Sequence, residues 1–170
     1  LFHVFGNDNI WGLEGIIDGR FKGYATHPDG TPTALSWPDQ FSPNSTSLRV
    51  HAGDEMSLPF GTMRVQATDE AIKIDSLGRA HVLGTALDDD QLVYSHQTDD
   101  GWAPIETFAN GGEGARLGLG PDDRPHAVYQ RGFDVRYATK VDGMWKSEWL
   151  DQYGAYPQTS VVATDDEVHL

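Results

Sequence analysis

The sequence has no cysteine, few basic residues and no long apolar run. Without cysteine the chain can form no disulfide framework, no thiolate zinc site and no cysteine nucleophile. Because no stretch of about 18 apolar residues occurs, we expect no membrane span and no membrane partner. Only 12 Lys and Arg accompany 26 Asp and Glu, giving a net charge of −14. We therefore expect no nucleic-acid partner, since phosphate contacts need clustered cations.

Turn-forming residues are abundant, with 19 glycines and 9 prolines among 170 residues. Between them lie short segments rich in β-branched and aromatic residues, and no segment shows a capped apolar stripe of helical period. The sequence therefore predicts an all-β protein. The expected strands of the two clearest stretches are 71–75, 80–86, 91–97 and 102–108, then 115–119, 125–130, 134–140 and 144–150.

Three landmarks recur in a fixed order: a histidine after a tight turn, then a tyrosine, then a tryptophan. They are His81, Tyr94 and Trp102 in one copy, His126, Tyr137 and Trp145 in the next, and His169 at the start of a further one. The two tyrosines are 43 residues apart, as are the two tryptophans. Four strands per repeat of this length, with an aromatic landmark in each, are typical of a β-propeller blade.

An earlier, partial copy is expected near the start of the chain. Residues 24–30 match residues 137–143 at Tyr, Ala, Thr, Asp and Gly, which aligns Tyr24 with Tyr137. The predicted fold is thus a β-propeller segment of about three and a third four-stranded blades. Its expected divisions are a first blade at 1–70 with a long insertion at about 31–66, a second blade at 71–112, a third at 113–156 and the start of a fourth at 157–170.

Both ends of the chain have a strand-like pattern, whereas propellers close with four to eight blades. Two arrangements would complete the ring. Either further blades belong to the same protein, or a second copy of the chain closes the ring. No signal peptide is present, so the sequence itself does not indicate a compartment.

The repeats, Asp-x-x-Gly-x-x-His followed by Tyr-Ala/Ser and Gly-x-Trp, resemble those of bacterial secreted propellers of the broad BNR or sialidase-like type. This resemblance covers 71–170 well and 1–30 loosely, and His stands where the strict Asp-box repeat has Trp. The group includes propeller-fold polysaccharide lyases and lectin-like propellers. The resemblance implies an extracellular or periplasmic protein that recognises a polysaccharide or other glycan, either within a lyase or glycosidase or as a non-catalytic lectin or scaffold.

The repeated landmarks have a structural interpretation and a functional one. A residue that recurs at one position of every blade usually does the same structural job, here a hydrogen bond that links turn and strand. Lining of a central channel and metal binding are the other roles open to the histidines. The tyrosines Tyr24, Tyr94 and Tyr137 and the two tryptophans are expected to pack in the core or between blades.

Functional residues are expected where the repeat is broken, because loops carry function on a rigid scaffold. In the insertion, His51, Arg49 and Arg64 are the candidate catalytic residues, since arginine pairs with a uronate carboxylate and histidine abstracts a proton. Trp37, His27 and His96 are the candidate substrate-binding residues. The charge of −14 disfavours a polyanion, so a neutral glycan fits more easily.

Paired aspartates in the predicted turns offer oxygen ligands for Ca²⁺, or serve simply as solvated turn formers. They lie at 88–90, 99–100, 122–123 and 165–166. Because none of them has the spacing of a known calcium loop, no cofactor and no metal ligand is assigned. Residues 111–114, Gly-Gly-Glu-Gly, are predicted to connect two blades, since no helix follows to make them a phosphate loop.

Overall fold

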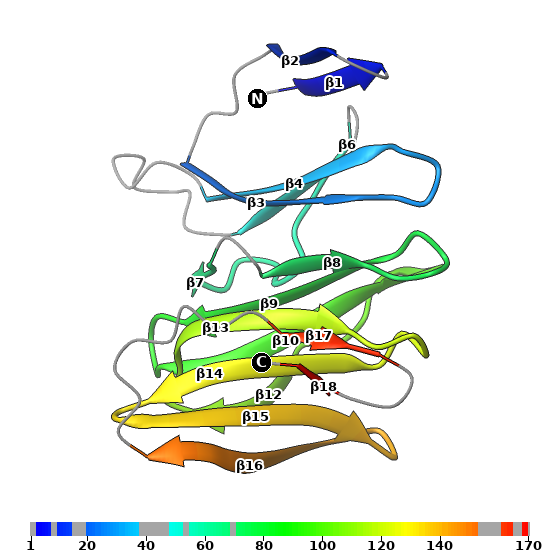
Figure 1. Ribbon diagram of the computed structural model, residues 1–170. Helices are drawn as coiled ribbons and strands as arrows, with labels where there is room; N and C mark the ends of the chain where they lie inside the picture. The colour runs from blue at the N-terminus through cyan, green and yellow to red at the C-terminus, as the bar shows by residue number, and fades with distance from the viewer. Residues whose placement is uncertain are drawn as a thin grey trace.

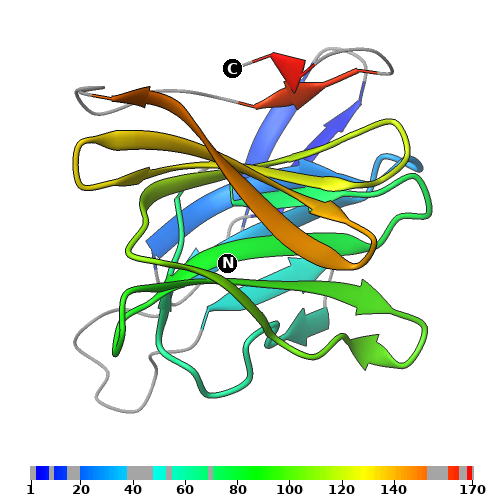
Figure 2. The same ribbon diagram turned by 90° about the horizontal axis from the view of Figure 1, so that it is seen from below.

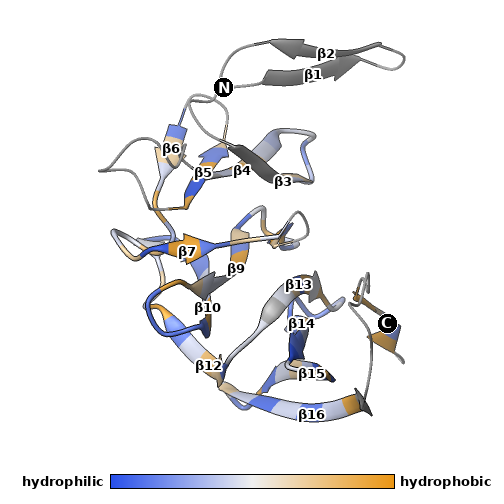
Figure 3. Cartoon of the chain, turned by 90° about the vertical axis from the view of Figure 1, so that its left-hand side faces the viewer, coloured by the Kyte–Doolittle hydropathy of each residue, from blue (hydrophilic) through white to orange (hydrophobic). Residues whose placement is uncertain are grey.

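The chain forms antiparallel β-sheets, and no helix occurs in the part that the computed structural model describes (Figure 1). That part comprises residues 3–7, 10–14, 20–37, 48–52, 55–68, 71–152, 161–164 and 168–169. The expected all-β class is therefore confirmed. The sheets follow one another in an open arc (Figure 3), and the described residues close no ring or barrel.

A hairpin and a four-stranded sheet come first. The hairpin pairs β1 (His3–Asn7) with β2 (Ile10–Glu14). The first sheet contains, in spatial and chain order, β3 (Arg20–Thr26), β4 (Pro32–Trp37), β5 (Arg49–Ala52) and β6 (Glu55–Ser57). Residues 31–66, expected as an insertion, thus supply three of the four strands of this sheet.

The second sheet is built around one central pair, β9 and β10. Its strands are β7 (Val65–Gln66), β8 (Ile72–Ile74), β9 (Ala80–Ala86), β10 (Gln91–Thr98), β11 (Gly101–Trp102) and β12 (Glu106–Asn110). Both β7 and β8 pair with β9, and both β11 and β12 pair with β10. The strand predicted at 102–108 is split in two, because Pro104 has no N–H to donate to the ladder.

The third sheet runs in simple order and is followed by a two-stranded one. The third sheet contains β13 (Glu113–Leu119), β14 (Pro125–Arg131), β15 (Asp134–Val141) and β16 (Met144–Gln152). A last pair joins β17 (Val162–Ala163) to β18 (Val168–His169). Seven of the eight strands predicted between 71 and 150 are thus confirmed in place, with β13 and β16 extending beyond their predicted ends, and the eighth, at 102–108, is the one that is split into β11 and β12.

Alternating side chains pack the sheets face to face. In β9, Val82 points toward the first sheet and packs with Leu35 and Val50, whereas Leu83 points toward the third and packs with Leu117. A third cluster joins the third sheet to β17 through Val128, Val135 and Val161. Because the second and third sheets bury both faces, the core consists of successive inter-sheet layers. Leaving the short β7 out of the count, the first strands of successive sheets contact one another: β3 contacts β8, β8 contacts β13, and β13 contacts β17.

Three turns between a first and a second strand have the same backbone hydrogen bonds. In each, the first residue's N–H bonds to the carbonyl of the fifth, and the fourth residue's N–H bonds to the carbonyl of the first. The fourth residue has a positive φ, 87° at Gly30, 80° at Gly78 and 59° at Asp123. The turns are 27–31, 75–79 and 120–124, so residue 27 corresponds to residues 75 and 120.

This correspondence corrects the expected alignment of Tyr24. Tyr24 lies in the first strand of its sheet, whereas Tyr94 and Tyr137 lie in third strands. Its side chain is 44% exposed, compared with 2% and 9% for the other two, so its predicted core role is wrong. The alignment failed because an Asp-Gly turn follows both β3 and β15, and local sequence does not say which hairpin of the sheet it closes.

Candidate functional site

His81 joins a turn to a strand, as predicted, whereas the hydrogen bond of His126 reaches the neighbouring strand. With the His81 proton on Nε2, the Tyr94 hydroxyl donates to Nδ1 across 2.6 Å and Nε2–H points to Asp75 at 3.4 Å. The Tyr137 hydroxyl donates to Nδ1 of His126 in the same way, across 2.5 Å. Burial lowers the pKa of both histidines, so both rings are neutral at pH 7.

Asp75 is the anchor of this network in the second sheet. Its carboxylate accepts hydrogen bonds from the backbone N–H of Leu77 and Arg79 and from Nε of Arg79 at 2.8 Å. Burial alone would raise the pKa of Asp75, but hydrogen bonds from Arg79 and His81 outweigh it and hold the pKa below its ordinary value. In the first sheet the residue types at the two equivalent positions differ. His27 occupies the place of Asp75, and its Nε2 forms a hydrogen bond with the Thr33 hydroxyl at 2.7 Å.

His96 lies opposite His81 in the ladder, and its ring stacks on His81 at 5.3 Å between ring centroids. Burial lowers the pKa of His96, and the charge of Lys140 adds to this effect. Its Nδ1 is buried and has no hydrogen-bond partner among the described residues. Because Tyr94 and His81 are almost fully buried, this cluster offers no room for a substrate, and its residues stabilise the interface between the second and third sheets.

Both predicted tryptophans pack between sheets, as expected. Trp102 packs against the core shared with the first sheet, and Trp145 against the core shared with the second. The Trp145 indole stacks on Phe108 at 4.1 Å and donates to Glu106 at 2.9 Å. Glu106 also accepts a hydrogen bond from Lys140 at 2.6 Å, so its carboxylate links the two sheets.

Two of the predicted catalytic residues are brought together. Arg49 and His51 alternate on β5 and therefore share the face opposite Val50, which is buried in the core. His51 is half-buried and its Nε2 lies 2.9 Å from the Ser36 hydroxyl on β4. Burial lowers the pKa of His51, and the charge of Arg49 lowers it further.

The other predicted site residues are spread over the molecule. Arg64 precedes β7 and forms an exposed ion pair with Asp88 at 3.2 Å, on the second sheet. His27 and His96 lie toward the end that carries the turns 27–31 and 75–79. Trp37 ends β4 at the opposite end, next to Arg20 in the ladder, and its side chain lies outside the described residues.

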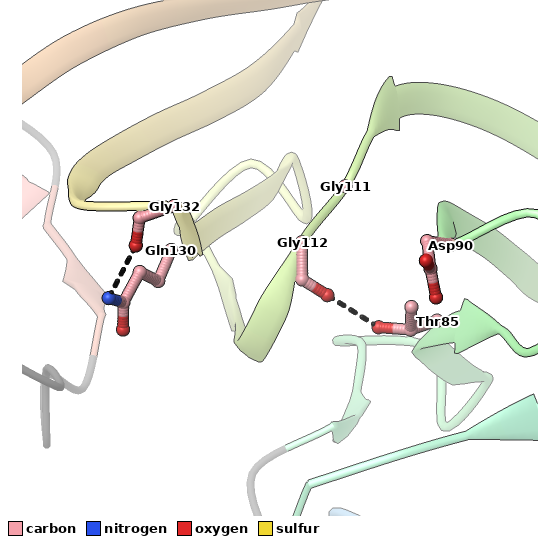
Figure 4. A pocket seen from close by; sticks show the side chains of 6 residues that line it. All are labelled: Thr85, Asp90, Gly111, Gly112, Gln130 and Gly132. Carbon is pink, nitrogen blue, oxygen red and sulfur yellow. Dashed lines mark hydrogen bonds between the residues drawn. The ribbon is translucent and has the colours of Figure 1, made fainter.

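A pocket of about 160 Å³ lies at the end of the second and third sheets that is opposite to the turns 75–79 and 120–124. It is lined by Thr85, Asp90, Gly111, Gly112, Gln130 and Gly132. Figure 4 shows Thr85 and Asp90 on one side of the Gly111-Gly112 connector, and Gln130 with Gly132 on the other. The pocket is therefore lined by polar side chains and by the backbone of three glycines, with polar and apolar atoms both at its surface.

Hydrogen bonds fix the walls of this pocket. Thr85 donates to the Gly112 carbonyl at 2.8 Å, and Gln130 donates through Nε2 to the Gly132 carbonyl at 2.7 Å. The N–H of Gly111 bonds to the carbonyl of Asp90 at 2.8 Å. A side chain at Gly112 would meet Leu92 at 2.6 Å, so the connector requires glycine there. The Asp90 carboxylate is exposed and bonds to no described residue, so it is free to accept hydrogen bonds from a ligand.

Sequence reasoning named the connector but missed the pocket. The Gly-Gly-Glu-Gly run was predicted to join two blades, and Gly111 and Gly112 do connect β12 to β13. Thr85 and Gln130 carried no signal, because they are ordinary strand residues 45 positions apart that only the stacking of sheets brings together. Of the paired aspartates, those at 88–90 and 99–100 are exposed in turns, Asp122 is exposed and Asp123 is partly buried, while 165–166 lie outside the described residues.

No group of three or more His, Asp or Glu in the described ranges is placed to hold a metal ion. In the same ranges, no helix is long and apolar enough to cross a membrane.

The chain matches no protein-family model and no curated protein. Its fold is similar to that of a protein of unknown function from Dyadobacter fermentans DSM 18053, with a TM-score of 0.58 and 16% sequence identity. The match covers 83% of this chain and 45% of the other, so the chain spans less than half the length of that protein. At this identity the likeness shows the fold alone.

Proposed function

We propose that the chain is part of a β-propeller that binds carbohydrate. Its antiparallel sheets stack face to face, their first strands are neighbours, and a connector leads from the last strand of one sheet to the first of the next. The repeats that resemble those of secreted BNR-like propellers support the same assignment. Further blades of the same protein, or a second copy, would complete the ring, and an extracellular or periplasmic location follows from the resemblance.

The pocket at the Gly111-Gly112 connector is the observation that carries the glycan proposal. A sugar presents several adjacent hydroxyls, and carboxylate, amide and peptide groups are suited to bond to them. Asp90 supplies a free carboxylate, and Gln130 keeps its carbonyl oxygen available while its amide N–H holds Gly132. The ligand is a neutral sugar, because the exposed carboxylates of residues 88–90 repel a uronate.

Binding of neutral glycans by the full chain tests the proposal. We expect Asp90→Asn to weaken binding at least about tenfold, because a hydrogen bond to a charged group is lost. Asparagine tolerates the positive φ of 56° at this position, so the turn is preserved. Calorimetry with the glycan selected on an array gives the affinity.

Asp142→Asn is the matched control, because Asp142 also has a positive φ and is exposed in the distant turn between β15 and β16. Equal affinities of the Asp90 and Asp142 variants would place the glycan elsewhere. Absence of any glycan binding would leave a non-catalytic scaffold for other proteins as the function.

A lyase site is the second candidate, and the pairing of Arg49 with His51 favours it. Arginine neutralises a uronate carboxylate, and a neutral histidine accepts the acidified C5 proton. The C4–O glycosidic bond then breaks, the oxygen leaves with the neighbouring sugar, and a C4–C5 double bond forms. The lowered pKa of His51 keeps its ring neutral at pH 7. This activity predicts rising ultraviolet absorbance from unsaturated uronate, which His51→Ala and Arg49→Ala should abolish. Activity that survives both substitutions would exclude this site.

A further inference from the structure

In the part of the chain that the structure describes, strand β16 leaves one edge of the third sheet unpaired. It is the last strand in the order β13-β14-β15-β16, and among the described residues it pairs only with β15. It forms the lower boundary of the molecule in Figure 1 and crosses in front of the other strands in Figure 2. Residues 146–150 are all exposed, including Trp149 at 59%. Such an edge is a ready template for another strand.

The charges of β16 are complementary to a reversed copy of the same strand. Antiparallel pairing centred on Ser147 places Lys146 of each strand opposite Glu148 of the other, giving two ion pairs. The same register places Trp145 opposite Trp149, on the other face. Shifting the centre to Lys146 or to Glu148 would place that charge opposite itself. One register is therefore favoured over its neighbours.

We propose that β16 pairs with β16 of a second copy of this chain, in antiparallel orientation about a two-fold axis through Ser147. The interface is isologous, so each copy contributes the same strand. It joins the two third sheets into one sheet of eight strands. The ladder register shifts between Val135 and Arg136, which leaves Leu150 as an extra residue and ends the regular edge there.

The expected dimer is weak. A five-residue strand pair buries less than the roughly 1,200 Å² of a stable interface, so association is expected at high protein concentration. Each copy has a net charge of −14, and salt near 0.15 M screens the resulting repulsion beyond about 8 Å. The dimer does not depend on the proposed glycan binding, because β16 contributes no residue to the pocket.

A charge-swap experiment on the full chain tests this pairing. Sedimentation equilibrium should show a concentration-dependent dimer for the wild type. Lys146→Glu and Glu148→Lys should each raise the dimer Kd at least about tenfold, since each replaces two attractive pairs with two repulsive ones. An equimolar mixture of the two variants should form a heterodimer, because every facing pair is again of opposite sign.

Restored association in the mixture is a result that a merely structural role of these exposed residues would not produce. Circular dichroism and urea unfolding confirm that each variant is folded. A wild type that stays monomeric at all concentrations overturns the proposal. Dimers that persist in both single variants, or a mixture that does not associate, also overturn it and assign contact to another surface or partner.

Discussion

At the scale of single residues, equivalent turns have different side chains at their first position and therefore different side-chain hydrogen bonds. The first position of the turn is Asp75 in one sheet, Gly120 in the next and His27 in the first sheet. Asp75 alone supplies a buried carboxylate, and its hydrogen bonds satisfy two backbone N–H groups. Gly120 has no side chain, and a Cβ there would lie 3.1 Å from Nε2 of His126.

Asp75→Asn should lower the free energy of unfolding at pH 7 by about 1–3 kcal/mol, because charged hydrogen bonds to Arg79 and the backbone become neutral ones. The pKa of Asp75 is lowered in the folded chain, so its contribution is present above the unfolded value of about 4 and is lost as pH falls through the folded value. Urea unfolding should therefore show the difference between the two proteins narrowing below pH 4.

Asp122→Asn is the control for this substitution. Asp122 bonds to Arg124 at the surface, and both side chains are about half exposed. We expect a loss below about 1 kcal/mol, since exposed ion pairs contribute little. Equal losses for the two aspartates would show that burial of Asp75 is not what makes its hydrogen bonds strong.

At the scale of elements, glycines set how closely neighbouring strands approach. A Cβ on Gly84 in β9 would lie 2.2 Å from Cγ1 of Val65 in β7. A Cβ on Gly118 in β13 would lie 2.7 Å from the carbonyl oxygen of Val161, beside β17. Both glycines are needed because another segment crosses their strand at close range.

Gly84→Ala should destabilise the chain by about 1–3 kcal/mol, the usual range for an overpacked core. Adding Val65→Ala removes the clashing methyl group, so the double variant should lose less than the sum of the two single losses. Chemical denaturation of the four proteins of this cycle measures the coupling. Strictly additive losses would mean that Val65 does not limit the space at Gly84.

At the scale of the whole molecule, stability comes from contacts between adjacent sheets. One buried cluster joins the first and second sheets, a second joins the second and third, and a third reaches β17. This resembles repeat proteins, in which stability is a sum of unit and nearest-neighbour terms. Loss of one layer should therefore affect the sheets on either side of it first.

Phe108→Ala should cost about 2–4 kcal/mol, because Phe108 stacks on Trp145 and meets the edge of Tyr129 in the layer between the second and third sheets. Hydrogen exchange should rise in β13–β16 before it rises in β3–β6. Phe133→Ala is the control, since Phe133 is 76% exposed and should cost under about 0.5 kcal/mol. A uniform rise in exchange would contradict stabilisation layer by layer.

The sequence by itself determined the strands and the repeat. Period-two alternation and Gly, Asp and Pro turns are local signals, so the strands from 80 to 150, apart from the split one at 102–108, were predicted nearly at their observed bounds. The predicted bond between turn and strand is present at His81, while the contact that His81 and His126 share is a hydrogen bond to a tyrosine of the next strand. The expectation of glycan binding drew on a resemblance and stays a prediction.

The tertiary structure alone decided which strand of the repeat each segment of the first sheet corresponds to, where the pocket lies, and which edge of the third sheet is free among the described residues. Tyr24 matched the wrong strand because hairpins of one sheet use similar turns, and only pairing with β4 distinguishes them. Thr85 and Gln130 line one pocket because successive sheets stack and bring together residues far apart in sequence. Local patterns fix which residues extend and turn, but which faces and edges lie together depends on packing between sheets, which no short stretch encodes.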